Sequence, residues 1–203
     1  MSTPPKADAN DDAASHSAVG TPRSAFPLVL IGYRGAGKTT VAQQLALALG
    51  WEWVDADVEV ELRAGKSIAA LFADEGEQVF RDLEAQTLAD LLRRESIVLA
   101  AGGGVVLREA NRRLLAERAR VVWLRASVET ILARIAADSS TAGRRPNLTT
   151  GGGPAEVVEL LAQREPLYRQ CAEAVIDTES KSPAQIAAEI VRGLNLSPRS
   201  EPA

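Results

Sequence analysis

The run Gly32-Tyr33-Arg34-Gly35-Ala36-Gly37-Lys38-Thr39 constrains this chain more than any other feature, because it fits the pattern G-x-x-x-x-G-K-[ST] in full. Glycines let the backbone turn so that several N–H groups point at phosphate oxygens, and a following helix adds the positive end of its dipole. Lys38 supplies a charge for the β- and γ-phosphates, and Thr39 offers a hydroxyl ligand to Mg²⁺. A chance glycine-rich turn is the alternative, but the motif lies between a predicted strand and a predicted helix, as a phosphate-binding loop requires.

Short apolar runs alternate with amphipathic segments along the rest of the chain. Strands are predicted at 26–31, 52–54, 96–101, 120–124 and 175–176. Helices are predicted at 38–49, 57–63, 67–74, 77–94, 109–117, 128–137, 154–171 (which Pro166 should bend or divide) and 182–194. This alternation predicts an α/β fold with a doubly wound parallel sheet, whose ligands gather at the carboxyl ends of the strands.

The 203 residues, 46% of them hydrophobic, suit one globular domain, which we expect at 26–194. Residues 1–25 lack hydrophobic periodicity and are predicted to be a disordered tail. The polar, glycine-rich stretch at about 138–153 is predicted to be a loop that forms a lid, and 195–203 a frayed C-terminal tail.

Composition argues against several classes of function. A net charge of −4 disfavours a nucleic-acid partner, and no apolar run is long enough to cross a membrane. The only histidine is His16 and the only cysteine Cys171, which disfavours a zinc site, a Ser/His or Cys/His catalytic pair and an intramolecular disulfide. We expect a cytoplasmic monomer that acts on small molecules.

Asp55 and Asp57 follow the second predicted strand. Two carboxylates two positions apart on an extended segment point to the same side. One of them can hold Mg²⁺ through a water while the other accepts a proton from a substrate hydroxyl. Alternatively, Asp57 is the N-cap of the helix that follows, and the two interpretations are compatible.

Several arginines have a surface role as their simpler interpretation. Arg81 and Glu84 stand at i and i+3, as in an exposed helical ion pair that contributes little to stability. The other candidates are Arg134, Arg144, Arg145 and Arg164. The guanidinium group of arginine suits phosphate and carboxylate ligands. Arg144 and Arg145 lie in a long loop and Arg164 follows it, which favours a role in binding for these residues.

Gly102–Gly104 follow an apolar strand, and three glycines in a row carry a high conformational entropy. They predict a floor on which a small ligand lies directly against the main chain, with a plain turn as the alternative. Trp51, Trp53 and Trp123 are predicted to be packing residues, because no basic-aromatic interleaving suggests base stacking.

Together these segments resemble the shikimate kinases over nearly all of 26–194. The matching pieces are, in order, GYRGAGKTT, DADVEVE, GKSIAALFADEGEQVFRDLE, LAAGGGVV, RRP, REPLY and IDT. The phosphate-binding loop alone identifies a superfamily, whereas the combination of D-x-D, G-E-x-x-F-R-x-x-E and G-G-G is much more specific. The resemblance implies a five-stranded sheet in the order 2-3-1-4-5. It also implies transfer of the γ-phosphoryl group of ATP to the 3-hydroxyl of shikimate, a step toward chorismate.

The resemblance also implies roles at the nucleotide. Thr39 would hold Mg²⁺ with Asp55 acting through a water, and Arg145 in the lid would reach the transferred phosphate. Arg134 and the segment 178–183 would pack around adenine. The full set implied for ATP is Gly35, Ala36, Gly37, Lys38, Thr39, Thr40, Arg134, Arg145 and Lys181.

At the acceptor, the resemblance makes Asp57 the group that binds the shikimate hydroxyls and takes the proton. Arg81 and Arg164 would clamp the carboxylate, Glu84 would orient Arg81, and Gly102–Gly104 would line the floor.

The lid departs from the family pattern. It reads Arg145-Pro146-Asn147-Leu148, where the family usually has an apolar residue after the proline, and a further glycine run follows at 151–153. Whether Arg144 or Arg145 reaches the phosphate therefore stays open.

Other functions fit the sequence less well. The first alternative is another small P-loop kinase, for gluconate or a nucleoside monophosphate, which would not require Phe80-Arg81 together with Gly102–Gly104. A GTP-binding switch lacks support because the N-K-x-D motif is absent. A non-catalytic nucleotide-binding module is disfavoured by the full set of Lys38, Thr39 and Asp57.

Overall fold

A computed structural model describes residues 26–137 and 153–198 of the chain. The elements follow one another as β1 (Leu28–Ile31), α1 (Lys38–Leu49), β2 (Glu52–Asp55), α2 (Ala56–Ala64), α3 (Ile68–Leu91), β3 (Ile97–Ala100), α4 (Glu109–Arg118), β4 (Arg120–Arg125), α5 (Val128–Ala137), α6 (Gly153–Cys171), β5 (Ala174–Asp177) and α7 (Pro183–Gly193). Every strand predicted from the sequence is present, within a few residues of its expected bounds.

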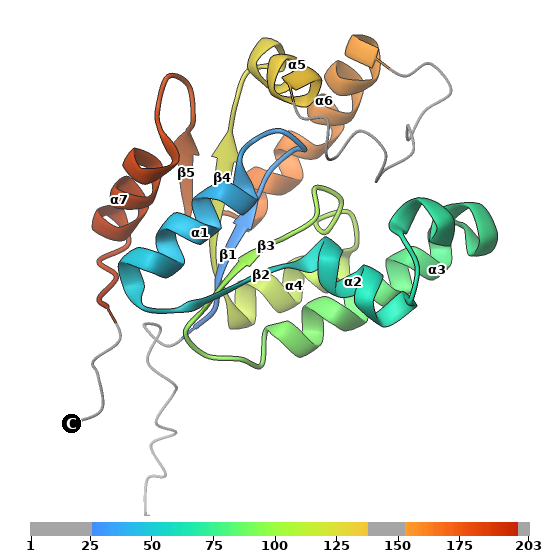
Figure 1. Cartoon of the computed structure of the whole chain (residues 1–203), viewed down its shortest axis with the longest axis horizontal. Coiled ribbons are helices and arrows are strands. Elements are labelled where there is room, and N and C mark those ends of the chain that lie inside the picture. The colour runs from blue at the N-terminus through green and yellow to red at the C-terminus, as the bar shows by residue number, and fades with distance from the viewer. Residues whose placement is uncertain (1–25, 138–152, 199–203) are drawn as a thin grey trace, which may run out of the picture.

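The five strands form one parallel sheet in the order β2-β3-β1-β4-β5, which confirms the predicted fold class (Figure 1). β1 lies in the middle of the sheet, paired with β3 on one side and β4 on the other. β2 and β3 lie on one side of β1, and β4 and β5 lie on the other, so β1 is the point where the chain changes the direction in which it adds strands. In such sheets the ligand site lies outside the carboxyl ends of the strands near this point.

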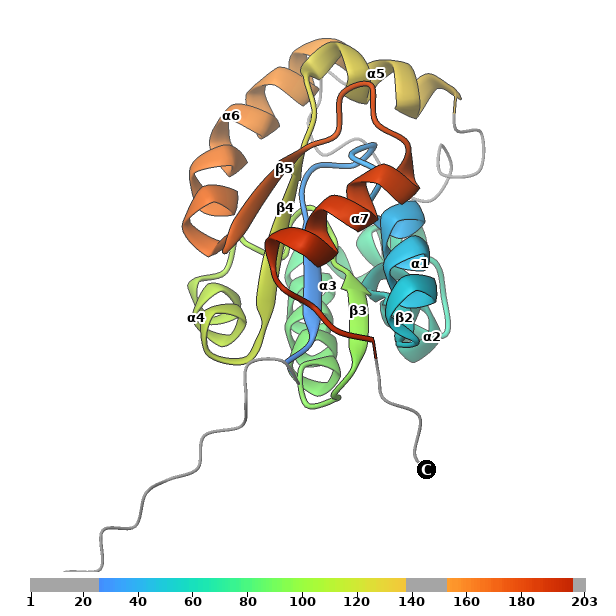
Figure 2. The same ribbon diagram turned by 90° about the vertical axis from the view of Figure 1, so that its left-hand side faces the viewer.

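Alternate residues of the strands fill two separate cores. Leu28 and Leu30 of β1 pack with α1 and α7 on one face of the sheet. Val29 and Ile31 pack on the other face, in a cluster that includes side chains of α3, α4 and α6. Because successive side chains of a strand point to opposite faces, a fully apolar strand is what a sheet covered on both sides requires. Figure 2 shows the two helical layers.

Two smaller clusters lie outside the main cores. One joins Tyr33 to α5 and the first half of α6, and the other joins α2 to Phe80 and the first part of α3. The second cluster is set apart by Gly76, where α3 has a non-helical backbone with φ 84° and ψ 171°. This glycine separates the two helices expected at 67–74 and 77–94. α6 runs through Pro166 without being divided.

Three details differ from expectation or extend it. Trp123 is buried at 1% exposure, but Trp53 is 40% exposed, because it lies on β2 at the edge of the sheet; its prediction as a packing residue was wrong. Leu196 is 8% exposed and packs in the first core, so ordered packing continues beyond residue 194. Across 26–137 and 153–198, no helix is long and apolar enough to cross a membrane.

Candidate active site

The phosphate-binding loop joins β1 to α1, and its glycines are required by the backbone. Gly32 has φ 141°, and a Cβ there would stand 2.5 Å from the carbonyl oxygen of Leu124. Gly35 and Gly37 have φ values of 82° and 90°, in the left-handed region that side chains avoid. Gly37 is the N-cap of α1 and has no side chain that could accept a hydrogen bond from the first turn. The first N–H groups of this helix can therefore bind an anionic ligand.

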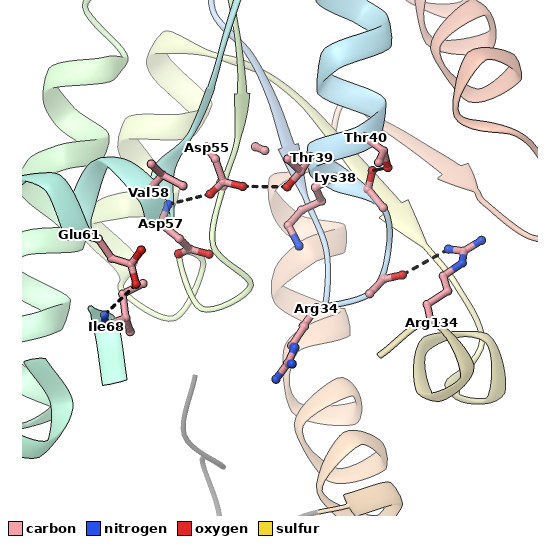
Figure 3. A pocket seen from close by; sticks show the side chains of 14 residues that line it. Arg34, Lys38, Thr39, Thr40, Asp55, Asp57, Val58, Glu61, Ile68 and Arg134 are labelled. Carbon is pink, nitrogen blue, oxygen red and sulfur yellow. Dashed lines mark hydrogen bonds between the residues drawn. The ribbon is translucent and has the colours of Figure 1, made fainter. Parts of the chain in front are cut away.

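A cavity of about 280 Å³ lies in front of this loop. Its walls come from the loop, the start of α1, the β2–α2 junction, the end of β3, and α5 (Figure 3). The lining residues are Arg34, Gly35, Gly37, Lys38, Thr39, Thr40, Asp55, Asp57, Val58, Glu61, Ile68, Ala100, Ala101 and Arg134. The phosphate motif and the two predicted carboxylates therefore share one cavity.

Lys38, Thr39 and Asp55 all line the cavity and have defined hydrogen-bond partners. Nζ of Lys38 donates hydrogen bonds to the carbonyl oxygens of Gly32 and Tyr33, both at 3.0 Å. The Thr39 hydroxyl donates to Oδ2 of Asp55 at 2.8 Å. A hydroxyl and a carboxylate oxygen are both ligands that suit Mg²⁺, and the two lie side by side at the start of α1.

Asp55, and not Asp57, is the N-cap of α2. Its Oδ1 accepts a hydrogen bond from the N–H of Asp57 at 3.0 Å, and its own backbone is extended. The interpretation of Asp57 as the cap was therefore wrong, because the helix begins earlier than expected. Asp57 lies in the first helical turn, half-buried, with its side chain at the cavity.

Arg81 and Glu84 form a buried ion pair, and neither of them is among the residues that line this cavity. They are 8% and 5% exposed, and Nη1 of Arg81 lies 2.9 Å from Oε2 of Glu84. Burial raises the pKa of the Glu84 carboxyl, although the charge of Arg81 acts in the opposite direction. A second acid, Glu77, lies 3.1 Å from Nη2 of Arg81. The exposed ion pair expected from the i, i+3 spacing was wrong: this guanidinium is held in place inside the protein.

Arg164 of α6 is also buried, at 5% exposure. Its guanidinium carbon lies 5.7 Å from the ring centre of Tyr33. We find no carboxylate in an ion pair with Arg164 among residues 26–137 and 153–198, and its Nε has no hydrogen-bond partner there. The charge of Arg164 acts on the pKa of the nearby Glu84 carboxyl, but no direct ion pair neutralises this buried guanidinium within the described residues, so the position favours an anionic ligand.

The guanidinium groups of Arg81 and Arg164 pack against the glycine run at 102–104. A Cβ on Gly104 would stand 2.3 Å from Nη1 of Arg81, and one on Gly103 would stand 3.6 Å from Nη1 of Arg164. The run does form a turn, with the N–H of Val105 bonded to the carbonyl of Gly102 at 3.1 Å. Within the described ranges, the N–H groups of Gly102–Gly104 are donors in none of the hydrogen bonds. The result is a buried surface rich in donors.

Comparison with known proteins decides the family. The family model described as shikimate kinase matches residues 34–195. The chain belongs to the shikimate kinase family. A shikimate kinase of Rhodopirellula baltica is 46% identical over 165 residues, covering 81% of this chain and 88% of that protein. One from Pseudomonas putida strain F1 is 42% identical over 171 residues, covering 84% and 97%.

Solved structures give the same result. The shikimate kinase of Acinetobacter baumannii, solved in complex with shikimate, has a TM-score of 0.79 and 36% identity. The match covers 85% of this chain and 94% of that one. The family model, the curated relatives and this structure all point to the same family, so the alternative kinases considered from the sequence are not favoured.

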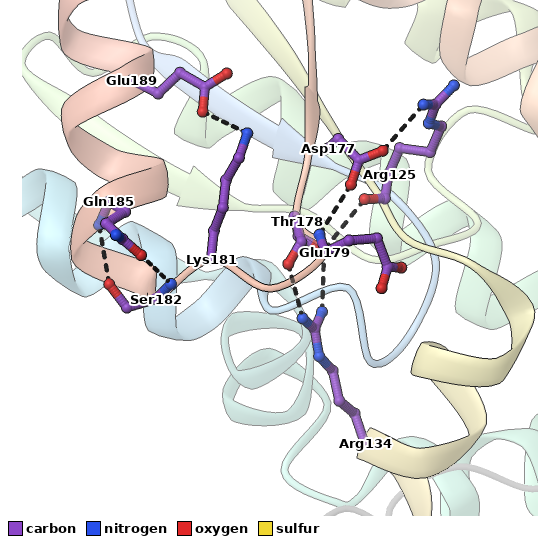
Figure 4. A network of polar contacts seen from close by, with 9 residues as sticks. All are labelled: Arg125, Arg134, Asp177, Thr178, Glu179, Lys181, Ser182, Gln185 and Glu189. Atoms are coloured by element: carbon purple, nitrogen blue, oxygen red, sulfur yellow. Dashed lines mark hydrogen bonds and ion pairs between the residues drawn. The ribbon is translucent and has the colours of Figure 1, made fainter.

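Arg134 of α5 bridges the phosphate loop and the segment that follows β5. Its Nη1 donates to the carbonyl of Gly35 at 3.4 Å. The same nitrogen donates to the Thr178 hydroxyl at 3.1 Å, as Figure 4 shows. Lys181 instead pairs with Glu189 of α7 at 2.6 Å and does not line the cavity. Arg144, Arg145 and the lid at 138–152 lie outside the described residues.

Sequence reasoning missed six residues that line the cavity: Arg34, Val58, Glu61, Ile68, Ala100 and Ala101. Glu61 accepts a hydrogen bond from the N–H of Ile68 at 3.0 Å and so links α2 to the start of α3. Its position one helical turn after Asp57 was a usable signal, because residues four apart share a helix face. Arg34 occupies a variable position of the phosphate motif, where the pattern itself gives no signal.

Proposed function

We propose that this chain transfers the γ-phosphoryl group of ATP to the 3-hydroxyl of shikimate, giving shikimate 3-phosphate and ADP. The observation that carries the choice of acceptor is the pair of buried arginines, Arg81 and Arg164, against the glycine run beside a complete phosphate-binding loop. Two buried guanidinium groups and an uncovered main chain suit a small acid that carries a carboxylate.

At the phosphate end, the loop amides and Lys38 hold the β- and γ-phosphates of ATP, with Gly35 to Thr40 forming the cradle. Thr39 and Asp55 would hold Mg²⁺, and their hydrogen-bonded hydroxyl and carboxylate fit a cation that keeps several waters. When bound, Mg²⁺ neutralises charge on the phosphates. Arg134 and Lys181 belong to the adenine side of the proposal, and Arg145, or Arg144, is assigned to the transferred phosphate.

At the acceptor end, Arg81 and Arg164 bind the shikimate carboxylate, and Glu84 fixes the direction of Arg81. Asp57 binds the acceptor hydroxyl and takes its proton as the phosphoryl group arrives. Phosphoryl transfer depends mainly on positioning and charge neutralisation, which is what this arrangement supplies. The proposal also includes action as a monomer in the cytoplasm, without a nucleic-acid partner.

The test is a coupled assay of ADP release with purified protein and Mg²⁺-ATP. Shikimate, gluconate and nucleoside monophosphates are compared as acceptors, and phosphorus NMR identifies the product. We expect turnover with shikimate alone and a single phosphate ester at its 3-hydroxyl. Faster turnover with gluconate or a nucleotide would overturn the proposal.

A further inference from the structure

Tyr168 lies beneath the glycine run and has no role in the function proposed above. Its side chain is fully buried, and its hydroxyl donates a hydrogen bond to the carbonyl oxygen of Gly103 at 2.6 Å. Its ring packs against that of Trp123, with the ring centres 5.8 Å apart. This short hydrogen bond therefore links helix α6 to the glycine run.

The surroundings of Gly103 show what this bond controls. A Cβ on Gly103 would have three nearest atoms: the carbonyl oxygen of Gly32 at 3.3 Å, the hydroxyl of Tyr168 at 3.5 Å and Nη1 of Arg164 at 3.6 Å. Two of these atoms are side-chain donors, and both come from one face of α6, since Arg164 and Tyr168 are four residues apart. A buried carbonyl needs a donor, so the neutral hydroxyl and the guanidinium are the two candidates for Gly103.

We propose that Tyr168 is a positioning residue that satisfies the Gly103 carbonyl and thereby keeps the Arg164 guanidinium directed at the carboxylate of the acceptor. The inference rests on the proposed function, because it assumes that Arg164 binds that carboxylate. Without the hydroxyl, the Gly103 carbonyl is left as a buried acceptor beside a cation. A charge-assisted hydrogen bond is stronger than a neutral one, so Arg164 turns to the carbonyl and is lost to the ligand.

The first variant is Tyr168→Phe, which removes the hydroxyl and keeps the ring against Trp123. We expect the KM for shikimate to rise by roughly tenfold, equivalent to ~1.4 kcal/mol. The KM for ATP and kcat should each change by less than about twofold, which also shows that the variant is folded. The matched control is Thr87→Val on α3, since Thr87 is fully buried and its hydroxyl has no hydrogen-bond partner in the described structure. This control should leave every kinetic constant unchanged.

Two further measurements separate positioning from a merely structural role. The first uses the analogue of shikimate in which a hydroxymethyl group replaces the carboxylate. Tyr168→Phe should leave kcat/KM for this alcohol within about twofold of the wild-type value, because Arg164 has no carboxylate to bind. The second adds Tyr168→Phe to Arg164→Gln, where we expect no further rise in the shikimate KM, because the two residues act as one unit.

The outcomes are distinct. Equal losses for the acid and the alcohol, additive effects with Arg164→Gln, or an unchanged shikimate KM with only a lower melting temperature would each overturn the inference and leave the proposed function intact. A wild-type protein that does not phosphorylate shikimate would overturn the proposed function and this inference with it.

Discussion

The phosphate end and the acceptor end of the site are built in opposite ways. The phosphate end is one contiguous run, Gly32–Thr39, and its groups are neighbours in sequence and in space. The acceptor end takes Arg81 from α3, Gly103 and Gly104 from the β3–α4 loop, and Arg164 from α6. The phosphate end is defined by local backbone geometry, whereas the acceptor end exists only once three separate elements are packed together.

This difference explains how the two ends handle charge. Lys38 is half-buried and donates hydrogen bonds to two carbonyl oxygens of its own loop. Arg81 and Arg164 are almost fully buried, and Glu84 is the buried carboxylate that faces Arg81. Arg81 also pairs with the more exposed Glu77, whereas we find no ion pair for Arg164 within the described residues, so Arg164 is the cation that an acidic ligand can neutralise.

The largest expected effect concerns Asp57, which stands between the two ends. Because Asp55 is the cap of α2, Asp57→Asn keeps the helix and removes only the base. We expect kcat to fall by about 10²–10⁴ while the melting temperature and the KM for ATP hardly change. Asp74→Asn is the matched control, since Asp74 is an exposed partner of Lys66. A fully active Asp57→Asn protein would show that this carboxylate takes no part in the reaction.

Lys38→Met tests the phosphate end alone. Charge moves toward the leaving oxygen in the transition state, so Lys38 matters more there than in the ground state. We expect turnover to fall by about 10²–10³. The control is Lys66→Met, which removes an exposed ion pair with Asp74 and Glu75. Near-normal turnover in a folded Lys38→Met protein would rule out this loop as the phosphate site.

Arg164→Gln tests the acceptor end alone. A charged contact that leaves a buried partner unpaired costs about 2–5 kcal/mol, so the KM for shikimate should rise by ~30-fold or more. The KM for ATP should hardly change, because the two ends do not share this residue. Arg113→Gln, which removes an exposed pair with Glu109, is the control and should change neither constant. Equal rises in both KM values would mean that Arg164 is structural.

The smallest effect is on the pH dependence of stability, measured with Glu84→Gln. Burial raises the pKa of Glu84 above its ordinary value of 4.5, so the folded state holds the proton more tightly than the unfolded state. Stability contributed by this group is therefore lost as the pH rises from 4.5 through the raised pKa. Urea unfolding at several pH values should show the wild type losing stability relative to Glu84→Gln across that window. A relative gain would mean that Arg81 outweighs burial at this carboxyl.

The contrast between the two ends also explains which features of the site could be predicted from the sequence. The phosphate loop, the parallel sheet and both carboxylates follow from local patterns and strand periodicity. Arg81 and Arg164 each have a simpler interpretation as surface residues, and only the resemblance to a family gave them a role at the acceptor, whereas the glycine run predicted a ligand floor by itself. Burial of the Arg81–Glu84 pair, the cap at Asp55 and the bond from Tyr168 to Gly103 depend on packing between distant elements. Spacing along the chain does not encode those contacts.

The most direct test of this division is the kcat/KM of the wild-type protein for shikimate against that for its hydroxymethyl analogue, with ATP saturating. If the arginine pair binds the carboxylate, the alcohol should be the poorer acceptor by ~30-fold or more, with the KM for ATP unchanged. Equal kcat/KM values for the acid and the alcohol would contradict the account, because Arg81 and Arg164 would then have no anion to recognise.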